Sequence, residues 1–76
     1  MDSHNTTIYK TSKFYKENNK PVHIRLTNGK YLRGYILSIN EDFKDRLVLV
    51  EETYGEILVL FERIQEDGIL PRIPKP

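Results

Sequence analysis

An aromatic side chain is embedded in the charged segment from residue 41 to residue 46, Glu-Asp-Phe-Lys-Asp-Arg. Phe43 offers a flat apolar ring, and Lys44 and Arg46 offer cations beside it. Proteins hold single-stranded RNA by stacking bases on aromatic rings or guanidinium planes and by contacting phosphates with basic groups. The segment therefore has the residue types of such a site. The alternative is that Phe43 closes one end of the core, because an aromatic residue in a small domain is often buried.

Further basic residues lie outside this segment. Three lysines recur at steps of three, which places them on one side of a helix. They are Lys10, Lys13 and Lys16. The row is either a solvated surface, the commoner role, or a secondary basic face that contacts phosphates. Arg63 has the same two interpretations, since it either contacts RNA or pairs with Glu62 or Glu66 on the surface.

Residues for catalysis or metal binding are sparse. The chain has no cysteine and two histidines, His4 and His23, with no metal-ligand spacing between them. A nucleophile needs an adjacent base and a group that orients it, and no serine stands in a recognisable motif. Adjacent acids such as Glu51-Glu52 are typical of solvated surfaces. We therefore expect no enzyme activity, no catalytic residues, no metal and no cofactor.

The chain of 76 residues is long enough for one domain with a small core. It carries 12 basic and 11 acidic residues, and a net charge of +1 does not mark a nucleic-acid binder. Its longest apolar runs are too short to cross a bilayer, and its first residues lack the regions of a signal peptide. We expect a cytoplasmic protein with no membrane partner, in which self-association supplies the stability that disulfides or metals supply elsewhere.

The region from residue 21 to residue 40 organises the rest of the sequence. Apolar and polar residues alternate from 22 to 26, which predicts a half-buried strand. Asn28-Gly29 then predicts a tight hairpin turn. The run from 31 to 39 is apolar on both faces, with Gly34 in its middle, where a missing side chain permits a bend or a close backbone approach. Such a strand is typical of a small barrel in which one strand bends to serve two sheets.

The remaining elements follow from similar patterns. We expect a short amphipathic helix, capped by Asn5, Thr6 or Thr7 and ended by the Asn18-Asn19 pair. Three shorter strands follow, and Pro71 places the last of them at an edge. The predicted boundaries are 1–7 for a flexible N-terminus, 8–18 for the helix, 47–50, 57–61 and 69–73 for the three strands, and 74–76 for a tail.

These elements predict a mainly β fold, with an N-terminal α-helix followed by a five-stranded, strongly bent small barrel over residues 21–73. Residues 8–73 form one domain. The third and fourth predicted strands have no polar face. An edge strand that joins the edge of a neighbouring copy would satisfy its backbone groups and bury this apolar surface. We therefore expect an oligomer.

The pattern from Val22 to Gly34 resembles the first motif of the Sm, LSm and Hfq superfamily, which is an apolar alternation, Asn-Gly, four residues and a glycine. The order of one helix and five strands is similar to that of the family, and the segment 62–72 is similar to the end of Hfq. The resemblance implies an Sm-like, SH3-type barrel that forms a homo-oligomeric ring of six or seven subunits. It also implies a non-catalytic RNA chaperone or scaffold that binds single-stranded, U- or A-rich RNA.

Positions that bind RNA in the family differ in this chain. Asn40 stands where the family usually has Asp. Two alignments of the following loop place Lys44 or Arg46 at the uridine-binding Asn of Sm proteins, and Asp42 or Phe43 at the stacking position. Arg63 is the nearest match to the Arg of the second motif, without the Gly that follows it there. The resemblance implies RNA contacts by Asn40, Phe43, Lys44, Arg46 and Arg63.

Two other functions stay open. The near-neutral charge and the altered pocket favour a structural or protein-adaptor module of the same fold with little RNA binding. A monomeric SH3-like or Tudor-like barrel is the other alternative, and it would have the mass of a single chain in solution.

Overall fold

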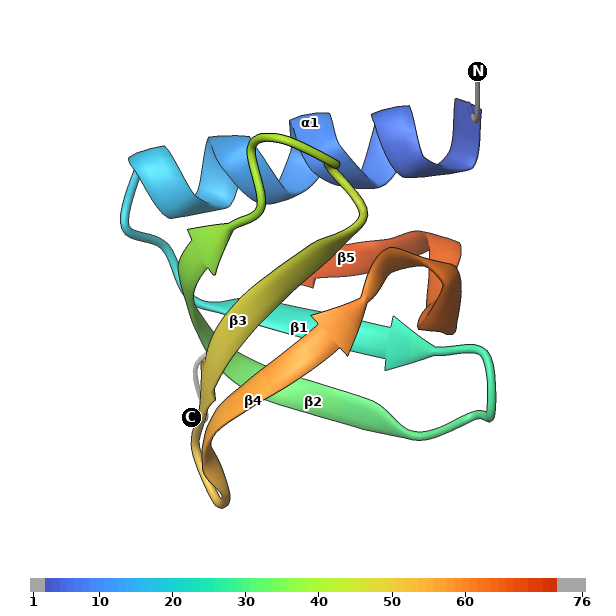
Figure 1. The fold of residues 1–76 in the computed structure, drawn as a ribbon. Helices are drawn as coiled ribbons and strands as arrows, with labels where there is room; N and C mark the ends of the chain where they lie inside the picture. Colours follow the sequence, from blue (N-terminus) through green and yellow to red (C-terminus); the bar gives the residue numbers. More distant parts are fainter. Residues whose placement is uncertain (1–2, 73–76) are drawn as a thin grey trace.

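A computed structural model describes residues 3–72 of the chain. One helix lies across one side of a five-stranded antiparallel sheet (Figure 1). The elements are α1 (Ser3–Glu17), β1 (Val22–Leu26), β2 (Tyr31–Ile39), β3 (Arg46–Glu51), β4 (Gly55–Leu60), the 3₁₀ turn η1 (Phe61–Arg63) and β5 (Ile64–Pro71). The prediction of a mainly β domain with an N-terminal helix is confirmed.

Helix α1 begins earlier than the sequence predicts. It starts at Ser3, so residues 3–7 belong to the helix, although we had assigned them to a flexible N-terminus and to helix capping. The Nε2 atom of His4 donates a hydrogen bond to the carbonyl oxygen of Phe61, 2.9 Å away. This contact ties the first turn to a segment far along the chain, so local sequence alone does not indicate it.

The helix ends one residue before the predicted boundary. Helix α1 ends at Glu17, and the amide of Asn18 donates to the carbonyl oxygen of Phe14 at 3.1 Å. Asn19 follows with a φ of 51°, in the left-handed region that asparagine tolerates better than most residues. The Asn18-Asn19 pair therefore turns the chain toward β1.

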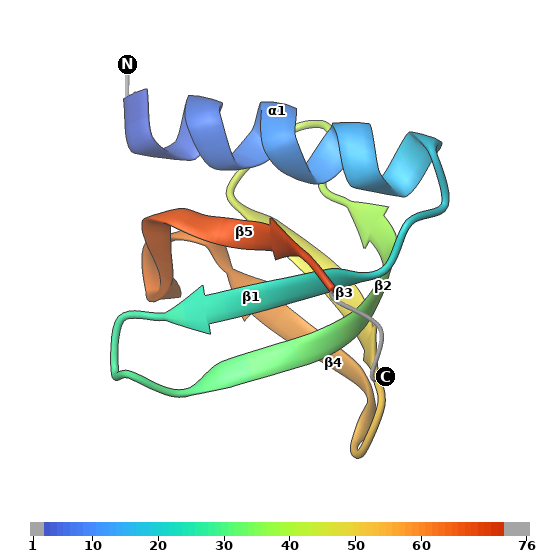
Figure 2. The same ribbon diagram turned by 180° about the vertical axis from the view of Figure 1, so that it is seen from behind.

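Strands β1 and β2 form the predicted hairpin (Figure 2). Gly29 has a φ of 86°, and the Oδ1 atom of Asn28 accepts a hydrogen bond from the amide of Lys30 at 2.9 Å. The predicted close approach at Gly34 is also confirmed, because the backbone of β3 fills the space that a side chain there would need.

The five strands lie in the order β4-β3-β2-β1-β5, so β4 and β5 form the two ends of the sheet. The register of β2 against β3 shifts between Ile36 and Ser38, and that of β1 against β5 shifts between Ile24 and Leu26. Among residues 3–72, no ladder joins β4 to β5. The expected barrel is therefore not closed by hydrogen bonds, and each end strand has an outer edge.

The bounds of the last three strands differ from the prediction, and β3 and β4 both begin before the predicted residues, at Arg46 and Gly55. Strand β4 ends at Leu60, and Phe61 lies in η1 with its side chain fully buried. Strand β5 already begins at Ile64, which is buried and pairs with Leu26, although the residues after it are polar. Residue 73 and the predicted tail 74–76 lie outside the described residues.

The core lies between α1 and the sheet. Its largest fully buried side chains come from all layers of the fold: Phe61, Ile8, Ile24, Leu47, Leu49, Ile64, Val22 and Ser12. The outer surface keeps apolar side chains in solvent, as the lack of a polar face on the third and fourth predicted strands indicates. Leu58 of β4 is 60% exposed, and Val50 of β3 and Leu37 of β2 are also exposed.

Candidate nucleic-acid interface

Asn40 shapes the loop that connects β2 to β3. Its side-chain Oδ1 accepts a hydrogen bond from the amide of Phe43 at 2.8 Å, and its carbonyl oxygen accepts one from the amide of Lys44 at 2.9 Å. Its own amide donates to the carbonyl oxygen of Arg46 at 3.0 Å. Lys44 has a φ of 53°. Asn40 therefore fixes the loop backbone, and an aspartate would accept the same side-chain hydrogen bond.

Phe43 projects from this loop with 72% of its surface exposed. The interpretation that it closes one end of the core is therefore wrong. The guanidinium of Arg46 lies 5.7 Å from the centroid of the Phe43 ring. Arg46 also pairs with Asp45, through Nε to Oδ1 at 2.9 Å and through a second nitrogen at 3.3 Å. The loop thus presents a ring and a guanidinium side by side, and each of these groups is a surface on which unpaired bases can stack.

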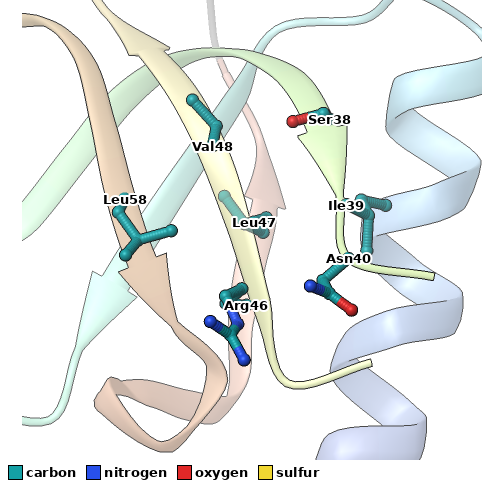
Figure 3. Close-up of a pocket in the computed structure, with 7 residues that line it drawn as sticks. All are labelled: Ser38, Ile39, Asn40, Arg46, Leu47, Val48 and Leu58. Carbon is teal, nitrogen blue, oxygen red and sulfur yellow. The ribbon is translucent and has the colours of Figure 1, made fainter. Parts of the chain in front are cut away.

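A hollow of about 160 Å³ opens beside this loop (Figure 3). Its polar lining comes from Asn40 at the end of β2, Arg46 at the start of β3 and Ser38. Its apolar lining includes Leu58 of β4. The structure therefore brings two predicted contact residues, Asn40 and Arg46, to one small cavity with an apolar wall.

Helix α1 holds the same loop through Tyr9. The Tyr9 hydroxyl donates a hydrogen bond to Oε1 of Glu41 at 2.5 Å. Lys13 donates from Nζ to the Tyr9 hydroxyl oxygen at 3.2 Å. The Nζ atom of Lys44 lies 5.0 Å from the centroid of the Tyr9 ring, and that of Lys13 lies 5.5 Å from it. Two lysines that are distant in sequence therefore lie beside one tyrosine ring.

Glu41 and Lys13, which both bond to Tyr9, each stabilise the charged form of the other. The hydrogen bond from Tyr9 lowers the pKa of Glu41, and the nearby lysines lower it further against the opposing effect of desolvation. The hydrogen bond to Tyr9 raises the pKa of Lys13, and Glu41 contributes in the same direction. Both groups are therefore fully charged near neutral pH.

The predicted basic row on α1 is divided by these contacts. Lys13 is half-buried and bonded to Tyr9, whereas Lys10 and Lys16 are exposed on the helix. Lys16 acts on Glu41 through its charge. The three lysines therefore differ in their surroundings, and Lys13 is hydrogen-bonded to Tyr9 beside the loop.

Arg63 lies apart from the loop cluster. It lines another hollow, of about 380 Å³, with Leu26 and Leu32 of the hairpin and the residues of β4. It forms no ion pair with Glu62 or Glu66, all three of which lie in the described part of the chain. The turn η1 does reach the loop, because the amide of Phe61 donates to the carbonyl oxygen of Asp45 at 2.8 Å. The structure thus joins the two segments but not the Arg63 side chain to the site.

The outward face of the β1–β2 hairpin carries a second aromatic and basic group. The rings of His23 and Tyr31 stack with their centroids 4.8 Å apart, and the guanidinium of Arg33 lies 5.2 Å from the Tyr31 centroid. Desolvation, followed by the charges of Arg33, Arg25 and Arg72, lowers the pKa of His23. Tyr31 was considered for base stacking, but a role in covering the core was preferred, whereas its ring is exposed. The alternation along the hairpin places His23, Tyr31 and Arg33 on one face.

Comparison of the sequence with protein-family models and with curated proteins finds no match. Between residues 3 and 72, no three side chains of the metal-binding types lie close enough together to hold a metal ion. Over the same residues, no helix has the length and apolar character needed to cross a membrane.

Proposed function

We propose that this chain is a subunit of an Sm-like, homo-oligomeric ring that binds single-stranded RNA without catalysing a reaction. The observation that carries the proposal is the exposed ring of Phe43 beside the guanidinium of Arg46. Exposure leaves apolar surface in water, and a nucleobase is a flat partner that removes it by stacking. Asn40 supports this role because it holds the loop in one conformation before a ligand arrives.

The fold supports the Sm-like part of the proposal. One helix followed by five antiparallel strands in the order β4-β3-β2-β1-β5 is compatible with that fold. The resemblance of residues 21–73 to the Sm, LSm and Hfq superfamily points in the same direction.

The two end strands support assembly. Strand β4 exposes Leu58, and strand β5 exposes Leu70. The hollow of about 380 Å³ beside β4 is lined mainly by apolar residues. A ladder between β4 of one copy and β5 of the next would pair both outer edges and cover this surface. Repeated loops around such an assembly would add weak RNA contacts by multivalency.

The proposal is tested by two measurements on the full chain. Light scattering should give a mass several times that of the 9.0 kDa chain. Fluorescence anisotropy with labelled oligouridylate and oligoadenylate should show binding that weakens as salt increases. A monomer mass contradicts the assembly, and the absence of binding to both oligonucleotides contradicts the RNA function.

A protein-adaptor module of the same fold is the second candidate. It is favoured by the exposed apolar side chains of Tyr35, Leu37, Val50 and Leu58 on β2, β3 and β4. Pull-downs from nuclease-treated lysate separate the two functions. Protein partners that persist after RNA is destroyed, together with no affinity for the oligonucleotides, would favour the adaptor.

A further inference from the structure

We propose that Tyr9 joins α1 and the 40–46 loop into one phosphate-binding site, in which Lys13 and Lys44 contact the RNA backbone and Glu41 balances their charge when RNA is absent. The inference rests on the proposed RNA-binding function and extends it. It assigns the backbone contacts to a pair of lysines from different elements. It also assigns a positioning role to Tyr9, and it makes Glu41 a competitor of the phosphate.

Two lysines, Lys13 and Lys44, converge on the ring of Tyr9. Lys13 lies one helical turn after Tyr9 and donates to its hydroxyl oxygen at 3.2 Å. Lys44 reaches the same ring from the loop, with Nζ 5.0 Å from the centroid. An ammonium over an aromatic face is attracted to the ring, so both side chains are held near one place. The site therefore loses less side-chain entropy on binding an anion than two free lysines would.

The lysine pair, Lys13 and Lys44, is connected to the stacking ring of Phe43 through the backbone of the loop. Lys44 directly follows Phe43, and the positive φ of Lys44 turns the chain between them. The Phe43 ring faces solvent, whereas the Lys44 side chain lies against α1. In the proposed site, a base stacked on Phe43 would direct its sugar-phosphate toward the next residue, Lys44, and so toward Tyr9. Base stacking and phosphate contact are the two parts of a single-stranded nucleic-acid site.

Charged side chains of both signs surround Tyr9. Lys13, Lys16 and Lys44 all act on Glu41, and Glu17 also acts on Lys13. Asp42 adds an acid to the loop, while Asp45 is already paired with Arg46. At Tyr9 itself, two lysines, Lys13 and Lys44, meet one carboxylate, that of Glu41. The Glu41 carboxylate is the acid bound within the cluster, so it opposes an incoming phosphate most directly.

Glu41→Gln is the decisive variant. A glutamine oxygen still accepts the Tyr9 hydrogen bond, but it carries no charge. We expect it to bind the labelled oligonucleotides about threefold to tenfold more tightly than the wild type at low salt. A purely structural role for Glu41 predicts unchanged or weaker binding.

The lysine variants test the contacts themselves. Lys13→Met and Lys44→Met should each weaken binding about threefold to tenfold and reduce the slope of log K against log salt by about 0.7, the value for one contact to a single strand. The matched control is Lys30→Met, at the tip of the β1–β2 hairpin and away from α1 (Figure 1), which should change affinity less than twofold. Tyr9→Phe keeps the ring but removes both hydroxyl hydrogen bonds, and it should weaken binding with an unchanged salt slope.

Thermal unfolding of each variant identifies a loss of fold, and Glu41→Gln keeps the test decisive because it predicts a gain. The inference is overturned while the RNA function stands if the wild type binds RNA and Lys13→Met behaves like Lys30→Met, or if Glu41→Gln does not tighten binding. The absence of RNA binding by the wild type overturns both. Binding of polyglutamate as tightly as RNA would overturn RNA as the ligand of this site.

Discussion

The backbone of Gly34 lies against the carbonyl group of Val50. A Cβ atom built on Gly34 would overlap the carbonyl oxygen of Val50, with the carbonyl carbon 2.8 Å away and Cα of Glu51 at 3.0 Å. The neighbours are backbone atoms of β3, so no rotamer change can make room. The missing side chain therefore lets the backbones of β2 and β3 approach closely where Gly34 pairs with Glu51.

Gly34→Ala should therefore be strongly destabilising. We expect a loss of about 3 kcal/mol or more, because either strand must shift to admit the methyl group. Urea unfolding measures this loss. Gly29→Ala is the comparison, since it meets no atom within 4 Å but has a φ of 86°, and it should cost about 1 kcal/mol. Equal losses in the two variants would contradict the steric explanation.

Glu51, which we expected on a solvated surface, is buried, and it should make the fold sensitive to acid. Burial raises its pKa, but hydrogen bonds from the amides of Thr53, Arg33 and Tyr54 outweigh burial and hold the pKa below its ordinary value. A lowered pKa means that the ionised group contributes stability above its ordinary pKa and loses it as the pH falls through the folded value.

Glu51→Gln removes this charge and should lower stability by about 1–3 kcal/mol at neutral pH. It should also flatten the decline below about pH 4.5. Chemical denaturation at several pH values measures both effects. The exposed Glu56→Gln on β4 is the control, with an expected change of less than about 0.5 kcal/mol. An unaltered pH profile in Glu51→Gln would count against the assignment.

His23 should titrate below the ordinary range of histidine. Desolvation and the charges of Arg33, Arg25 and Arg72 lower its pKa, so its contribution to stability is present above the ordinary pKa of 6.5 and declines as the pH falls. Arg33→Met should raise the pKa of His23 only part of the way, because the burial remains. NMR titration of the ring protons measures this shift. Arg46→Met is the control, because Arg46 does not contribute to the lowered pKa of His23, and it should leave that titration unchanged.

Phe43→Ala should separate binding from folding. Loss of a base-stacking ring costs about 1–3 kcal/mol of RNA affinity per base. Stability should change by less than about 0.5 kcal/mol, since the ring is mostly exposed. Anisotropy titration and thermal unfolding give the two values. Tyr54→Ala is the matched control, because Tyr54 is 75% exposed at the β3–β4 turn, and an equal loss of affinity there would exclude a specific role for Phe43.

Leu58→Lys should weaken assembly without unfolding the subunit. The Leu58 side chain is mostly in solvent within one chain, but it lies on an end strand of the sheet. A charge placed there opposes burial in a contact between copies. Light scattering across a range of concentrations should show a lower mass than for the wild type. Tyr54→Lys supplies the comparison, and a mass equally reduced by both substitutions would point away from the β4 edge.

Local signals predicted the parts of the fold that depend on backbone conformation. The Asn28-Gly29 turn, the close approach at Gly34 and the helix end at Asn18-Asn19 are all set by residues with unusual steric freedom. The helix start was missed because the hydrogen bond from His4 to Phe61 is a tertiary contact. The start of β5 was missed because polar residues follow the buried Ile64.

In the candidate site, too, local sequence predicts one part, and tertiary packing determines the other. Phe43 and Arg46 are close in sequence, and their pairing follows from one short loop. The approach of Lys44 to the Tyr9 ring, where Lys13 also lies, depends on the packing of α1 beside that loop, which no local pattern specifies. Arg63 was selected by its position after the fourth strand, but the direction of its side chain depends on η1.

In the proposed assembly, the two end strands also limit the kind of polymer that copies of this chain would build. Because β4 and β5 are different strands, a ladder between them joins the head of one copy to the tail of the next. Such a contact is heterologous, and it repeats until the last copy meets the first or continues as an open helix. A substitution that alters the angle between neighbours should therefore convert a closed particle into filaments, a change that electron microscopy would reveal directly.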